Sequence, residues 1–165
     1  MDVNAGVFYN GTSDGTNNYY AGVSLYHINR QKESFQAGQY YLQPRVTFQA
    51  GGKIPMGENA IHVSANYSRQ SGASNAMLGG AYALNVNNGG TMPTNLYLGT
   101  WYRFGDALIP YIGLEFGELQ IGATYDVNIS SLKPASNMRG GAEFSLIYIR
   151  QHRDPSAKKL NCPKF

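Results

Sequence analysis

Apolar and polar residues alternate with a period of two along most of the chain. The alternation is regular in residues 39–50, 61–68 and 119–130, and weaker in six further runs. Such alternation is typical of a β-strand with one apolar and one polar face, and it predicts about nine antiparallel strands and no helix. The weaker runs are residues 3–9, 19–28, 76–86, 96–104, 108–116 and 142–150.

Turn-forming residues separate the predicted strands. Gly117-Glu118 has Gly at the first central position, as a type II′ turn prefers, and this turn pairs Phe116 with Leu119. The pairing keeps the apolar residues of both strands on one face. The other turn signals are Asn10-Gly11, Asp14-Gly15, Gly51-Gly52, Ser71-Gly72, residues 87–90 and residues 105–107.

A three-residue turn at residues 105–107 would align Gly99, Gly113 and Gly122 across three strands on the polar face. Two interpretations of this glycine row are open. In the structural one, the glycines let the sheet curve and leave room for neighbouring aromatic rings. In the functional one, they form a smooth groove for a plug or a partner chain. The aromatic residues beside the row are Trp101 and Tyr111.

Composition indicates that part of the surface does not face water. Charged residues make up 14% of the chain, whereas a soluble domain carries about 25%. No run of apolar residues is long enough for a membrane-spanning helix.

Strands with one apolar and one polar face fit a barrel in a lipid bilayer, because there the hydrogen-bonding groups of the backbone are satisfied only if the sheet closes. Tyrosines expected to form interfacial girdles are Tyr19, Tyr20, Tyr40, Tyr41, Tyr97 and Tyr102.

Three observations keep other architectures open. Alternating faces also occur in soluble β-sandwiches, where the apolar face meets a second sheet. Pro44 and Pro110 lie inside strand runs, where each removes a ladder donor and indicates a bulge or an edge. An odd number of strands departs from the even number that is usual in bacterial barrels.

The C-terminal third of the chain carries the most specific motifs. Residues 121–149 read IGATYDVNISSLKPASNMRGGAEFSLIYI, and the chain ends in NCPKF. These motifs resemble the PorP/SprF family of type IX secretion system membrane proteins. Residues 26–35, YHINRQKESF, resemble the same family more weakly.

The resemblance implies an all-β fold, an antiparallel transmembrane β-barrel of the bacterial outer membrane. This chain would supply about nine C-terminal strands of a larger barrel of about 14 strands. Residues 1–150 are expected to form the strands and residues 151–165 a basic periplasmic tail. The resemblance also implies a role in the export or surface anchoring of adhesins and gliding-motility proteins. The implied partners are outer-membrane lipid, those secreted proteins and periplasmic secretion-ring components.

Residues 128–141 form the candidate contact site for a partner. Hydroxyls, an amide and two cations surround Pro134, a composition that can hydrogen-bond an extended strand or a carboxylate. In the alternative interpretation, the segment is only a rigid connection. The basic tail could likewise dock a ring component or be a solvated end. The candidate contact residues are Ser130, Ser131, Lys133, Asn137 and Arg139, together with Trp101 and Tyr111 on the strands.

No arrangement of residues indicates an enzyme. The three histidines lie on separate elements without ligand spacing, and the single Cys162 cannot form an internal disulfide or a Cys-based zinc site. Basic residues exceed acidic ones only from residue 150 onward, which argues against nucleic acid as a partner of the strands. We expect a protein without catalytic residues, cofactor or metal. The polar face alone also fits a passive outer-membrane pore or channel.

Overall fold

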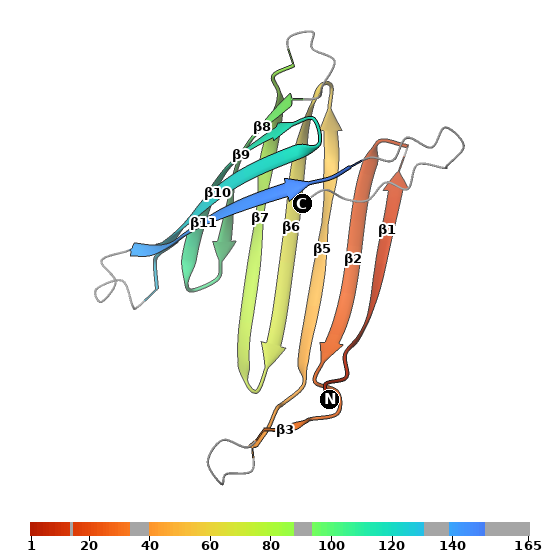
Figure 1. The fold of residues 1–165 in the computed structure, drawn as a ribbon, viewed down its shortest axis with the longest axis vertical. Helices are drawn as coiled ribbons and strands as arrows, with labels where there is room; N and C mark the ends of the chain where they lie inside the picture. Colours follow the sequence, from red (N-terminus) through yellow and green to blue (C-terminus); the bar gives the residue numbers. More distant parts are fainter. Residues whose placement is uncertain (14, 34–39, 88–93, 131–138, 151–165) are drawn as a thin grey trace.

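The computed structural model describes residues 1–13, 15–33, 40–87, 94–130 and 139–150. These residues contain no helix and form one nine-stranded antiparallel sheet, in which strands adjacent in the sheet follow one another along the chain (Figure 1). A short hairpin, β3 (Lys32–Glu33) and β4 (Tyr40–Tyr41), interrupts the connection between the second and third strands of the sheet. The all-β, antiparallel prediction is confirmed. The strands of the large sheet are β1 (Ala5–Ser13), β2 (Asn17–Tyr26), β5 (Arg45–Met56), β6 (Asn59–Gln70), β7 (Ala73–Asn85), β8 (Thr94–Arg103), β9 (Ala107–Phe116), β10 (Leu119–Asn128) and β11 (Arg139–Tyr148).

Tight turns join several of these strands, and glycine supplies the backbone conformation that they require. Gly117 has φ 62° and pairs Phe116 with Leu119 across the turn, as predicted. The turn at residues 71–72 is also confirmed. A turn at residues 57–58, in which Gly57 has φ 64°, was not predicted.

Two predicted turns are wrong. Asn10-Gly11 lies inside β1 and Gly51-Gly52 lies inside β5. Gly51 is needed for a close approach and not for a turn, because a Cβ there would collide with the Val63 carbonyl and the Tyr20 hydroxyl. Glycine in a strand therefore gave a false turn signal.

The predicted register between β8 and β9 is displaced by two residues. Gly113 lies opposite Gly122 as expected, but Gly99 lies opposite Tyr111. The turn consists of residues 104–106, since Arg103 pairs with Ala107 across it. A displacement by two leaves each side chain on its predicted face.

All nine strands place apolar side chains on one face of the sheet, which we call the outer face. Leu98, Ile112 and Ile121 at its centre are 51%, 53% and 48% exposed. No second sheet covers this face in the described part of the chain, where the only other sheet is the β3–β4 hairpin. A soluble β-sandwich does not fit, because its apolar faces must pack together. Cross-strand pairs on the outer face include Val23 with Phe48, Ala65 with Leu78, Tyr82 with Leu98, Leu98 with Ile112, and Leu114 with Ile121.

Aromatic side chains on the outer face gather towards the strand ends. We call the end with the turns at residues 57–58 and 117–118 the upper end, and the end with the turns at residues 71–72 and 104–106 the lower end (Figure 1). Two belts of this kind are how transmembrane strands meet the two membrane interfaces. The upper belt contains Tyr19, Tyr82, Phe116 and Tyr148, and the lower belt contains Phe48, Tyr67, Tyr102, Phe104 and Tyr125.

Two tyrosines assigned to the girdles face the other way. Tyr20 and Tyr97 are 9% and 7% exposed and lie on the polar face. Position near a strand end was the wrong criterion, since adjacent residues such as Tyr19 and Tyr20 point to opposite faces. Parity within each strand assigns them correctly.

The polar face, which we call the inner face, is the concave one. Strands β9 to β11 run obliquely across the direction of β5 to β7 (Figure 1). In the part that the structure describes, β1 and β11 are the edges of an open sheet. The ladder between β9 and β10 has no pairs at Tyr125 and Asp126, opposite Pro110 and Ile109, so the irregularity predicted at Pro110 is present. Pro44 lies before β5 and outside any strand, so its predicted place inside a strand is wrong. The buried residues are Tyr20, Ala60, Ala81, Ala83, Tyr97, Ala107, Ile109 and Glu115, all on the inner face.

Candidate functional site on the inner face

Aromatic rings on the inner face lie against glycines of their own or neighbouring strands. A Cβ added at Gly113 or Gly122 would collide with the Tyr111 ring, and one at Gly79 would collide with Trp101. These glycines therefore make room for rings, as the structural interpretation of the glycine row proposed. The same relation joins Tyr20 to Gly51 and Phe8 to Gly22.

Trp101 and Tyr111, two of the predicted contact residues, are in contact. Their ring centroids are 5.6 Å apart with an interplanar angle of 83°, an edge-to-face arrangement. The Trp101 indole donates a hydrogen bond of 2.7 Å to Ser64 Oγ, and Gln120 Nε2 donates one of 3.4 Å to the Tyr111 hydroxyl. Both side chains are thus tied into the wall of the sheet by their polar ends.

A buried carboxylate lies nearer the upper end of the same face. Glu115 is 5% exposed and accepts hydrogen bonds from the Tyr97 hydroxyl at 2.5 Å and from Asn95 Nδ2 at 3.0 Å. The Tyr97 ring meets His62 edge-on, with centroids 5.6 Å apart. Sequence reasoning did not single out this group, because its members come from three strands and carry no local motif. The parity of each strand and the register are the signals that bring them together.

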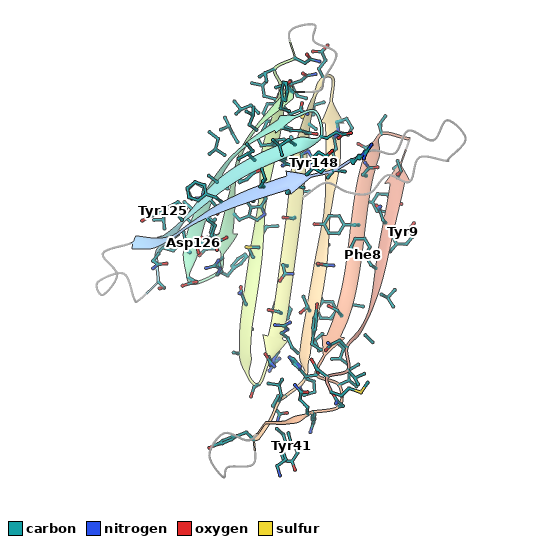
Figure 2. All side chains as sticks on the ribbon, in the orientation of Figure 1. Phe8, Tyr9, Tyr41, Tyr125, Asp126 and Tyr148 are labelled. Atoms are coloured by element: carbon teal, nitrogen blue, oxygen red, sulfur yellow. The ribbon has the colours of Figure 1, made fainter. Side chains whose placement is uncertain are left out.

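An ion-pair cluster lies at the lower end. One guanidinium nitrogen of Arg103 lies 3.1 Å from Asp106 Oδ2 and 2.9 Å from Asp126 Oδ2. The Asp106 carbonyl also accepts hydrogen bonds from the amides of Ile129 and Ser130, at 2.8 and 3.1 Å. Figure 2 shows Asp126 beside Tyr125 near the lower end of β10. The cluster fixes the point at which the chain leaves β10.

The remaining predicted contact residues follow this point. Ser130 is held by the Asp106 carbonyl, and the backbone of Arg139, at the start of β11, lies opposite Val127. In the register, the backbone of Arg139 lies beyond Thr124, the residue opposite Tyr111. Ser131, Lys133, Asn137 and the tail of residues 151–165 lie outside the described residues.

The described residues hold no group of three or more His, Cys, Asp or Glu side chains suited to a metal ion. They also include no helix of the length and apolar character needed to cross a membrane.

Comparison with known proteins adds family-level information. The family described as type IX secretion system membrane protein PorP/SprF matches residues 1–148. No curated protein matches the chain, and no solved structure does. The family match extends from β1 to the end of β11 and so covers every described strand. It confirms the resemblance drawn from the C-terminal motifs.

Proposed function

Since this chain belongs to the PorP/SprF family and is therefore a membrane component of the type IX secretion system, we propose that it forms part of the wall of an outer-membrane β-barrel. This wall supports the export or surface anchoring of adhesins and gliding-motility proteins. Its role is non-enzymatic, because a wall that holds or receives a secreted protein forms and breaks no covalent bond.

The outer face is the observation that carries the proposal. Its exposed apolar centre and two aromatic belts reverse the arrangement of a soluble protein, in which large apolar patches are covered. Lipid is the environment that such a face fits. In an outer membrane the two belts would lie at the two interfaces.

The partners follow from this placement. We propose that secreted proteins contact Trp101 and Tyr111 on the inner face and the segment from Ser130 to Arg139, which follows β10 in the chain. The ion-pair cluster around Arg103 supports the second contact, since it anchors the start of that segment. The basic tail of residues 151–165 is proposed to dock a periplasmic ring component through its charge.

The secretion role is tested by deleting the gene in its host and labelling adhesins on intact cells with antibody. Loss of surface adhesin, restored by the wild-type gene, is expected. Complementation should fail with Leu98→Lys, which places a charge at the centre of the outer face at a cost of about 2–4 kcal/mol. It should succeed with Gln49→Lys, a matched change on the inner face. Normal adhesin display in the deletion strain would contradict the proposal.

A passive pore is the second candidate, favoured by the polar inner face. The aromatic rings on that face argue against a wide open lumen, because Tyr20 and Tyr97 are buried within it. Conductance of the reconstituted protein in planar bilayers separates the two. A steady open channel supports the pore, and a silent protein supports the scaffold.

A further inference from the structure

A cavity of about 220 Å³ opens on the inner face near the upper end, between β5 and β8. The cavity exists because two alanines lie between larger side chains such as His62 and Tyr97. Ala60 and Ala83 pair across β6 and β7 and are 5% and 4% exposed, and they form the floor. Tyr97 stands beside them on β8, opposite Ala83. Because a water molecule occupies about 30 Å³ in the liquid, the cavity has room for a small ion and part of its hydration shell.

Lys53 and His62 line the cavity and lie directly opposite each other in the register of β5 and β6. His62 Nε2 is buried and has no hydrogen-bond partner among the described residues; it donates in the tautomer that carries the ring proton on this nitrogen. Lys53 is exposed, and no ion pair of Lys53 occurs in the described part of the chain. An acceptor held between the two groups would satisfy the buried nitrogen, whose unmet hydrogen bond is costly.

Other polar groups lie at or near the cavity. Asn59 Oδ1 accepts a hydrogen bond of 2.9 Å from the Asn85 amide, so this side chain is engaged at the strand end. Glu115 is bonded to Tyr97 and Asn95. Glu58 is a carboxylate in the exposed turn at the rim. The donors at the cavity are therefore Lys53 and His62, and two carboxylates oppose an anion: Glu58 at the rim and Glu115, whose charge acts on His62.

We propose that this cavity binds a single oxyanion group, a carboxylate or a phosphate, through Lys53 and His62. Charge-assisted hydrogen bonds from Lys to such groups are the strong ones. The inference concerns a site on the inner face and does not depend on the secretion role.

The test uses the full chain folded in detergent micelles with ¹⁵N-labelled histidine. Sodium phosphate and sodium acetate are titrated separately at an ionic strength held constant with chloride. His62→Gln identifies the His62 ring signal among the three histidines. We expect this signal to shift in a saturable manner with one or both anions, and the two titrations distinguish phosphate from carboxylate.

Matched variants locate the site. Lys53→Met should weaken binding about tenfold or more, because a charged donor is lost. Lys32→Met, the same change in β3 at the lower end, should leave anion binding unchanged. Glu58→Gln should strengthen anion binding, because it removes a negative charge at the rim. If Lys53→Met does not fold, as judged by heat-modifiable migration, Lys53→Gln replaces it. The proposal is overturned if neither anion gives a saturable shift, if chloride alone reproduces it, or if the folded Lys53 variant binds as the wild type does.

Discussion

At the scale of single residues, glycine has two separate roles in this sheet. At Gly57 and Gly117 it adopts the positive φ of a turn. At Gly79 and Gly113 it lies inside a strand and leaves space for an aromatic ring on the inner face. The second role accounts for some of the 20 glycines of the chain, which stand in strands although glycine weakens strands.

Gly79→Ala tests this second role. The added methyl group would meet the Thr100 carbonyl and Trp101, and overpacking of this kind costs about 1–3 kcal/mol. We expect a lower midpoint of urea unfolding and a shifted emission of Trp101, the one tryptophan of the chain. Gly141→Ala is the control, because no atom lies within 4 Å of a Cβ there. Equal effects of the two substitutions would contradict the account.

The sequence predicted some of the candidate site at this scale. Parity alone placed Trp101 and Tyr111 on the polar face, and the structure brings their rings together. Parity could also have placed Tyr97 and Glu115 on the same face. The two residues are neighbours in either register of β8 and β9: directly opposite in the predicted one, and diagonal in the structure, where Asn95 lies opposite Glu115.

At the scale of elements, the sequence predicted where strands occur better than how they pair. Periodicity identified the strands because each has one apolar and one polar face. The turn between β8 and β9 was displaced because Gly105 can occupy more than one position of a short turn, and the faces are the same in both registers.

Paired cysteines test the β8–β9 register. In the structure Leu98 lies opposite Ile112, whereas the alternative register places Leu98 opposite Leu114. With Cys162 replaced by Ser, L98C/I112C should form a disulfide on mild oxidation in membranes, since directly opposed positions have Cβ atoms about 5 Å apart. L98C/L114C should not. Gel mobility with and without reductant measures both, and preferential cross-linking of the second pair would show that the register is wrong.

At the scale of the whole molecule, the exposure of apolar and polar side chains is the reverse of that in a soluble protein. Its largest apolar side chains are exposed, and its buried residues are chiefly small or aromatic groups on the polar face. Period-two alternation with 14% charged residues favoured this arrangement, because lipid is the environment that such an uncovered face fits. What lies beside the two edge strands could not be predicted, because a strand's apolar and polar pattern does not specify its neighbour. The two edges of the described sheet are β1 and β11, which run in the same direction because strand direction alternates along a sheet of nine antiparallel strands.

The central claim is that the outer face contacts lipid and the inner face contacts water. Spin labels at Leu98 and Ile112 on the outer face, and at Gln49 and Thr124 on the inner face, test it most directly in reconstituted vesicles. The account predicts that oxygen, which concentrates in lipid, relaxes the first pair more strongly, and that a water-soluble nickel chelate relaxes the second pair more strongly. Equal accessibility of both pairs to the nickel chelate, or the reverse order, would contradict it.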